Sequence, residues 1–240
     1  MDIAFLWSTV LAILPGVPTT LKLTAISVFI GLFLALALAA MRLSGHPLLV
    51  LPARAYVFVF RGTPLLVQIY LIYYGLAQFS LVRESLLWPF LREAYWCAIL
   101  ALTLNTGAYA SEIVRGGLQS VPFGQIEAAR AAGMSRLVMF RRIVAPLAIR
   151  QALPGYSNEL ILMIKSTSLA SIITIFEISG LAYKVASETY RYIEVFFVAG
   201  LIYLSLNFAI TRAIQSLEHW LSPHLRPAPA TPLLSALKAV

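Results

Sequence analysis

Apolar runs long enough to cross a lipid bilayer recur along this chain, and they constrain its fold more than any other feature. A membrane-spanning helix needs about 20 mostly apolar residues, and residues 20–41, 94–113, 156–176 and 195–214 meet that length. A shorter run, residues 64–79, follows the apolar stretch 48–60, and Gly62 and Pro64 interrupt a helix between them. We expect this pair to form one span entered through an irregular segment, with a re-entrant piece as the alternative. The sequence therefore predicts an all-α polytopic membrane protein with five transmembrane helices.

Composition agrees with this class. Hydrophobic residues make up 60% of the 240 residues and charged residues only 12%, whereas soluble domains are usually about a quarter charged. The net charge of +8 suggests a nucleic-acid partner. The basic residues, however, lie between the apolar runs and form no groove-lining patch with interleaved aromatics. This distribution favours a role in membrane topology and argues against nucleic acid as a partner.

The basic residues are distributed unevenly between the connections of the five spans. Connections 1–2 and 3–4 and the tail carry 12 lysines and arginines, and connections 2–3 and 4–5 carry 4, beside glutamates that include Glu177, Glu188 and Glu194. Cytoplasmic connections hold the excess of Lys and Arg. We therefore expect the N-terminus outside, the C-terminus in the cytoplasm, Arg136 in the cytoplasm and Arg191 outside.

The two ends of the chain lie outside the predicted spans. Residues 1–14 have no basic n-region and no clear cleavage site. We expect residues 1–17 to form a short interfacial helix that ends at Pro15 and Pro18. The tail, residues 222–240, is rich in proline and poor in charge, and it is expected to be a flexible cytoplasmic segment.

Motifs for catalysis or metal binding are missing from the sequence. Cys97 is the only cysteine, and the three histidines lie outside the apolar spans with no ligand spacing. No glycine-rich phosphate-binding loop is present, so another chain must hydrolyse any ATP that is used. We therefore expect no metal site, no cofactor in this chain and no enzymatic activity. A polytopic membrane enzyme and a homo-oligomeric channel remain as alternatives.

The connection between the third and fourth spans is long, basic and helical in character. Residues 124–132 are good helix formers between Pro122 and Gly133, a start and a stop signal. Small alanines such as Ala128 and Ala129 make a slim helix that can enter a groove on another protein. A second helical stretch, residues 137–153, is expected to lie along the membrane surface. The alternative is a solvated loop that merely satisfies the charge rule.

Several motifs resemble those of one transporter family. Glu127-Ala128-Ala129, then Gly133, Ile149 and Leu153-Pro154, resemble the cytoplasmic loop motif of ATP-binding-cassette (ABC) importer permeases. Segments 60–64, 104–106, 157–159 and 165–169 resemble the polar and basic amino-acid branch of that family. The resemblance is greatest to the second, M-type permease subunit of histidine and octopine or nopaline uptake systems, and it covers residues 18–221.

The resemblance implies the type I ABC importer permease fold over residues 18–221, in a bacterial inner membrane. It implies a coupling loop at about residues 115–154 that docks on the ATPase through Glu127, Ala128, Ala129, Arg130 and Gly133. The implied partners are a homologous second permease, an ATPase dimer that holds ATP and Mg²⁺, and a periplasmic solute-binding protein. The implied substrate is an amino acid or amino-acid derivative, either a basic amino acid such as histidine or arginine or an opine.

Polar residues inside the spans are candidates for the substrate pathway, since such groups are costly in a membrane. In the third span Asn105, Tyr109 and Glu112 share one helical stripe. In the fourth, Glu159 shares a face with Ser166, and Lys165 lies about 120° away around the helix. Glu159 thus has no obvious ion-pair partner, and it suits either a cationic substrate group or a group within the protein. The predicted pathway residues are Asn105, Tyr109, Glu159, Lys165, Ser166, Thr167 and Ser168.

Overall fold

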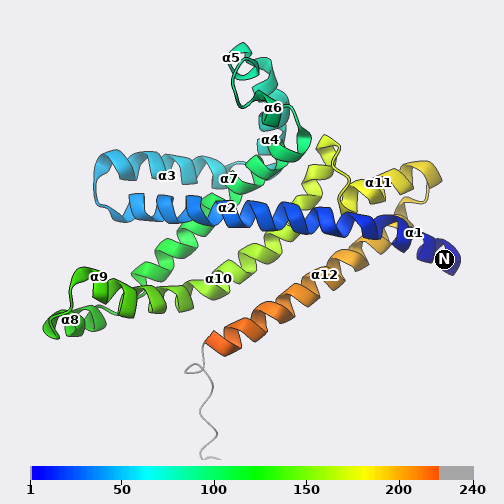
Figure 1. Cartoon of the computed structure of the whole chain (residues 1–240). Coiled ribbons are helices and arrows are strands. Elements are labelled where there is room, and N and C mark those ends of the chain that lie inside the picture. Colours follow the sequence, from blue (N-terminus) through cyan, green and yellow to red (C-terminus); the bar gives the residue numbers. More distant parts are fainter. Residues whose placement is uncertain (1, 222–240) are drawn as a thin grey trace, which may run out of the picture.

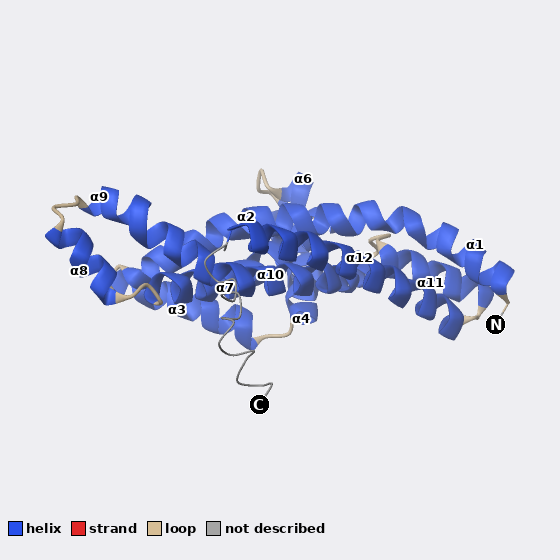
Figure 2. Cartoon of the chain, turned by 90° about the horizontal axis from the view of Figure 1, so that it is seen from below, coloured by secondary structure: helices blue, strands red, loops and turns tan. Residues whose placement is uncertain are grey.

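All the secondary-structure elements in the described part of the chain are helices, and most of them lie along one elongated body (Figures 1 and 2). The structure is a computed structural model that describes residues 2–221. The helices are α1 (Ile3–Ile13), α2 (Val17–Leu43), α3 (Pro47–Gly62), α4 (Leu65–Tyr70), α5 (Ser80–Arg83), α6 (Trp88–Leu91), α7 (Ala94–Gln119), α8 (Phe123–Ala131), α9 (Arg136–Met139), α10 (Ala145–Ser166), α11 (Ile178–Thr189) and α12 (Tyr192–Leu221). The tail predicted for residues 222–240 lies outside the described residues.

Within residues 2–221, three helical stretches are long and apolar enough to cross a membrane, and the number rises to five if each of two bent helix pairs counts as one span. The three are Ile3–Leu43, Ala94–Gln119 and Tyr192–Ser216. The bent pairs are α3 with α4 and its continuation to Gln78, at 106°, and the run Arg136–Ile173 with α11, at 48°. The predicted polytopic, all-helical architecture is confirmed, and the expected irregular second span is the more strongly bent pair.

The N-terminal segment differs from the prediction. α1 ends at Ile13, just before Pro15, but a short 3₁₀ turn over Leu14–Gly16 joins it to α2, so that Ile3–Leu43 is one helical run of 41 residues. Each proline occupies the first turn of the helical piece it opens, where no hydrogen bond from its nitrogen is needed. The short N-terminal helix is therefore present, but it is not separate from the helix that follows. Its interfacial position stays a prediction.

Small residues let α2 and α7 pack closely along their length. A Cβ atom placed on Gly31 would lie 2.4 Å from Thr106 Cγ2, and one on Gly107 would lie 2.7 Å from Leu34 Cδ2. Glycines allow this approach between membrane helices because lipid provides little hydrophobic drive for association, so contact must come from close packing. The α2–α7 pair is the centre of the fold, and a buried cluster including Leu23, Ile69 and Leu102 extends from it.

The fourth predicted span and the helical stretch before it form one continuous run. The helix that begins at Arg136 passes through a π-helical turn, Phe140–Val144, and continues as α10 and a 3₁₀ segment to Ile173. Residues 137–153 therefore do not lie as a separate surface helix, as the sequence suggested. They extend α10 directly, because Pro146 stands in the first turn of α10 and interrupts nothing.

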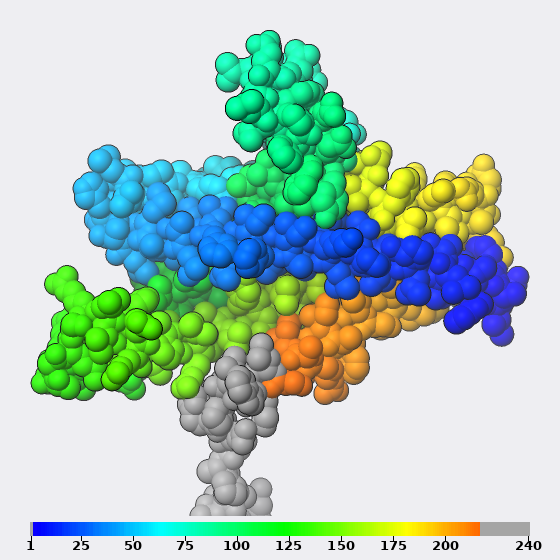
Figure 3. Space-filling view, in the orientation of Figure 1, coloured from blue at the N-terminus to red at the C-terminus, as the bar shows by residue number. Residues whose placement is uncertain are grey.

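The outer shape has two ends and one projection. α8 and α9 form one end, and the N-terminus with α11 forms the other (Figure 1). α4, α5 and α6 project sideways from the body, as the space-filling view shows at residues coloured teal (Figure 3). The guanidinium of Arg191, which precedes α12, lies 3.7 Å from the ring centroid of Phe5 in α1. The connection between α11 and α12 is thus at the same end as the N-terminus.

Candidate functional site

A cavity of about 470 Å³ lies where the break between α3 and α4 meets α7 and α10. Its volume falls in the range of small-molecule sites, roughly 300 to 1,000 Å³. Its polar lining residues include Arg61, Asn105, Tyr109, Glu159 and Ser166. Four of the seven predicted pathway residues therefore line one cavity, and Arg61 joins them from the α3–α4 break.

The amide side chains of Gln68 and Asn105 stabilise the break between α3 and α4. Backbone carbonyls at a helix end need partners, above all within a membrane. Gln68 Nε2 donates to the carbonyl oxygens of Phe60 at 2.9 Å and Thr63 at 3.1 Å, and Asn105 Nδ2 donates to Gln68 Oε1 at 3.0 Å. Asn105 and Gln68 are both buried. Asn105 therefore fixes the edge of the cavity, and its amide nitrogen is already engaged.

Glu159 is the acidic group of the cavity. Its carboxylate is 7% exposed and accepts a hydrogen bond of 2.9 Å from the hydroxyl of Thr106 in α7. Within residues 2–221 it forms no ion pair, so its negative charge is not matched by a bonded cation. The guanidinium of Arg61 lines the same cavity, 5.2 Å from the ring centroid of Tyr109. The carboxylate of Glu159 and the guanidinium of Arg61 thus line one cavity that is large enough for a zwitterionic ligand.

The remaining predicted pathway residues lie elsewhere. Lys165 and Ser168 line a second cavity, of about 500 Å³, together with Tyr203 and Asn207 of α12. Thr167 is fully buried, and its hydroxyl donates to the carbonyl of Ile164 at 2.7 Å. The predicted set is therefore divided by α10: Ser166 faces the first cavity, and Lys165 faces the second.

Glu177 is a buried carboxylate that the sequence reasoning placed in an external connection. It is 0% exposed and accepts hydrogen bonds from Tyr203 Oη at 2.5 Å, from the Gly180 amide at 2.9 Å and from Thr20 Oγ1 at 3.4 Å. Counting it as an exposed charge was wrong, because it caps α11 and joins that helix to α2 and α12. The signal in the sequence was an acidic residue at a helix start, three positions before Gly180.

The predicted coupling residues lie on α8 or, for Gly133, just after it, at the end of the molecule opposite the N-terminus (Figure 1). Of the five, Ala129 is buried and Glu127, Ala128, Arg130 and Gly133 are exposed. Gly133 has a φ of +73°, its amide donates to Arg130 O at 2.9 Å, and the Met134 amide donates to Ala129 O at 3.1 Å. This pair of bonds is the Schellman arrangement that closes a helix with a left-handed residue. The start near Pro122 and the stop at Gly133 are confirmed.

Charged residues also meet where α7 approaches α8. Glu112, on the predicted stripe with Asn105 and Tyr109, does not line the cavity and instead pairs with Arg42 of α2 and Arg115 of α7. The Arg42–Glu112 pair therefore joins the ends of α2 and α7. Among the described residues no group of three or more His, Cys, Asp or Glu side chains is arranged to hold a metal ion.

The chain matches proteins of known function over most of its length. The family model described as "Binding-protein-dependent transport system inner membrane component" matches residues 27–223. The octopine transport system permease protein OccM of Rhizobium meliloti is 62% identical over 225 residues, which are 94% of this chain and 92% of that protein. The histidine/lysine/arginine/ornithine transport system permease protein HisM of Escherichia coli strain K12 is 41% identical over 215 residues, 89% of this chain and 90% of that protein.

A solved structure has the same fold. An amino acid ABC transporter crystallised with histidines contains a chain with a TM-score of 0.81 and 35% sequence identity, and the match covers 91% of this chain and 98% of that one. The family assignment makes the chain a non-catalytic transport component and not an enzyme, as the sequence predicted, and it places the chain in the inner membrane. The chain belongs to the binding-protein-dependent inner membrane permeases, and it is a permease of the polar amino-acid ABC importers, of the M type.

Proposed function

We propose that this permease imports a substrate with a cationic side chain, a basic amino acid or an opine, and that Glu159 binds the cation. The relatives at 62% and 41% identity are named for octopine and for histidine, lysine, arginine and ornithine. The single observation that carries the proposal is Glu159, which is buried, lines a cavity of about 470 Å³ and, among the described residues, is hydrogen-bonded only to a neutral hydroxyl.

The chemistry of the cavity suits such a substrate. A guanidinium or ammonium group forms charge-assisted hydrogen bonds with a carboxylate, and these are the stronger class of hydrogen bond. Arg61, which lines the same cavity, is available for the substrate carboxylate that every amino acid and opine carries. Burial of Glu159 strengthens its interaction with a cation, because the local dielectric constant is lower than that of water. Neutral substrates of similar shape lack this interaction and are rejected.

Within the transporter, this subunit pairs with a homologous second permease, two ATPase subunits and a periplasmic solute-binding protein. Its N-terminus lies outside and its C-terminus in the cytoplasm, in line with the excess of basic residues in the alternate connections. α8 then faces the cytoplasm and docks on the ATPase through Glu127, Ala128 and Arg130, which are exposed. Lys165 and Ser168 belong to the pathway on the far side of α10.

The substitution Glu159→Gln tests the substrate assignment. It keeps the shape of the side chain and the hydrogen bond from Thr106 but removes the charge. We expect complex assembly and basal ATP hydrolysis to persist, with the apparent affinity for a basic substrate lowered roughly 5- to 150-fold, equivalent to about 1–3 kcal/mol for a charge-assisted hydrogen bond. Uptake into proteoliposomes is measured with saturating binding protein, so that the external binding step does not mask the change.

The matched control is Glu188→Gln, which makes the same change at an exposed residue of α11. It should transport like the unmodified complex. If Glu159→Gln transports arginine and octopine with unchanged affinity, the carboxylate serves only the packing of α7 against α10, and the charge-selection proposal fails.

A further inference from the structure

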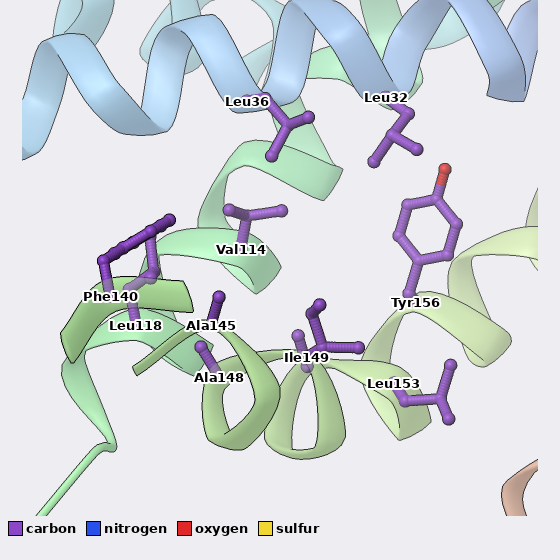
Figure 4. Close-up of a pocket in the computed structure, with 11 residues that line it drawn as sticks. Leu32, Leu36, Val114, Leu118, Phe140, Ala145, Ala148, Ile149, Leu153 and Tyr156 are labelled. Atoms are coloured by element: carbon purple, nitrogen blue, oxygen red, sulfur yellow. The ribbon is translucent and has the colours of Figure 1, made fainter. Parts of the chain in front are cut away.

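A second type of site lies away from the substrate cavity, in an apolar cavity of about 400 Å³ between α2, α7 and the first part of α10. Leu32 and Leu36 line it from α2, Val114 from α7, and Phe140, Ile149 and Tyr156 from the run that contains α10. Figure 4 shows these side chains converging on one space, with the hydroxyl of Tyr156 at its edge. No charged residue lines it, so amino acids and nucleotides are unsuited to it.

Several side chains that line this apolar cavity are exposed at the surface of the protein. Leu36 is 47% exposed, Phe140 48% and Ile149 61%. Large apolar groups exposed around a hollow mark a surface that something apolar covers. The floor is closed, since a Cβ atom on Gly117 of α7 would lie 2.7 Å from the carbonyl oxygen of Ala148 in α10. The cavity is therefore an indentation with an apolar mouth and no passage between the helices.

The depth of the cavity matches the cytoplasmic half of a bilayer. Leu32 and Leu36 precede the end of α2 at Leu43 by eleven and seven residues, or about 16 and 10 Å along a helix with a rise of 1.5 Å per residue. Half of a hydrocarbon core of about 30 Å is about 15 Å. In the orientation proposed above, the cavity thus lies at the depth of acyl chains in the cytoplasmic leaflet.

Arginines stand beside the cavity at the level of its outer lining. Arg141 and Arg142 follow Phe140 directly in the π-helical turn, and Arg150 follows Ile149. All three are exposed, and none forms an ion pair with another residue in the range 2–221. Basic groups next to an apolar space between membrane helices on the cytoplasmic side are the recognition pattern for anionic lipid head groups.

We propose that this cavity binds one acyl chain of an anionic phospholipid, with the lipid phosphate held by Arg141 and Arg142. Because α10 also carries Glu159, the lipid packs between the α8–α9 end of the molecule and the substrate cavity. Charge selects the lipid: a zwitterionic phospholipid offers the same chain but no net negative charge to the two guanidinium groups.

Photo-crosslinking tests the proposal. The full transporter is placed in nanodiscs that contain a trace of phosphatidylglycerol with a diazirine in one acyl chain, and the labelled residues are identified by peptide mass spectrometry. We expect labelling of Leu36 and Ile149, and several-fold less with phosphatidylcholine that carries the same photoactive chain. The nanodisc exposes both leaflets to the probe, so the result does not depend on the proposed orientation.

Two variants, each with a matched control, complete the test. Ala145→Phe fills the cavity and should abolish the labelling, whereas Ala37→Phe, at an exposed position of α2 outside the cavity, should leave it unchanged. The double variant Arg141→Gln and Arg142→Gln should remove the preference for phosphatidylglycerol, whereas Arg83→Gln with Arg92→Gln should keep it. Equal labelling by both lipids, or labelling that survives Ala145→Phe, would overturn the proposal.

Discussion

Two buried glutamates of this permease have different surroundings, and the difference assigns their roles. Glu177 accepts three hydrogen bonds, from Tyr203, Thr20 and the Gly180 amide, and faces neither of the two polar cavities. Glu159 accepts one bond from a side-chain hydroxyl and faces a cavity. Because a carboxylate has about four acceptor sites, Glu177 is largely satisfied by the protein, and Glu159 retains acceptors for a ligand.

The substitution Glu177→Ala should therefore destabilise the permease without a specific effect on substrate affinity. It leaves the Gly180 amide without its acceptor, and an unsatisfied buried group costs about 1–3 kcal/mol. It also removes the hydrogen bond from Tyr203, whose hydroxyl keeps Ser179 Oγ as a partner at 3.2 Å. We expect a lower temperature of thermal aggregation for the purified complex. Glu188→Ala, which changes an exposed residue of the same helix, serves as the control and should be neutral. Equal thermal stability of the two variants would contradict the bracing role.

Helical periodicity placed Asn105 with Tyr109, and Glu159 with Ser166, on shared helix faces, and all four line one cavity. Glu112, on the first of these faces, pairs with Arg42 instead. Periodicity was insufficient for Arg61 and Glu177. Arg61 ends α3 at a break, and its position depends on the 106° bend between α3 and the helical segment that follows. Glu177 lies between two helices, and its burial depends on Thr20 and Tyr203, which are distant in the sequence.

At the scale of helices, α8 is the segment with the strongest local signals. Its boundaries follow from Pro122 and Gly133, and the structure differs from the predicted range by one residue at each end. By contrast, Pro15 and Pro18 mark the change from α1 to α2 without interrupting the helical run, because proline is tolerated in the first turn. Local signals therefore locate a helix best where a start residue and a left-handed glycine occur together.

Gly133→Val and Glu127→Lys test the docking role of α8. Valine at a φ of +73° carries a strain of roughly 1–2 kcal/mol, and its relief reorients the chain that follows α8. Lysine at position 127 reverses a charge on the exposed face of the helix. We expect both variants to bind the solute-binding protein normally and to lose ATP-driven uptake, measured in proteoliposomes.

Gly45→Val separates docking from strain. Gly45 has a φ of +71°, and like Gly133 it has no atom within 4 Å of an added Cβ, but it connects α2 to α3. This variant carries a similar strain and should retain uptake. Gly124→Val adds the same side chain inside α8, at a site with no positive φ and no close neighbour. Uptake at the normal rate in both Gly133→Val and Glu127→Lys would remove the docking role.

At the scale of the whole molecule, the two ends should lie on opposite sides of the membrane. Arg136 is at the α8–α9 end, and Arg191 is at the end that carries Phe5. We expect a membrane-impermeant thiol reagent to label Arg191→Cys but not Arg136→Cys in intact cells. The native Cys97 is fully buried and provides little background. Labelling of position 136 from outside would reverse the proposed topology.

The continuous helical run Arg136–Ile173 also has a thermodynamic consequence. Glu159 lies 23 residues from its start, about 35 Å along the axis. The end at which we propose that the ATPase docks and the cavity that Glu159 lines therefore share one element, with a single π-helical turn between them. If the nucleotide state of the ATPase changes the affinity of the cavity by some factor, linkage requires the substrate to change nucleotide affinity by the same factor. Under this condition, substrate binding in the permease would alter nucleotide binding by the ATPase through the same helical run that transmits the effect of nucleotide on the substrate cavity.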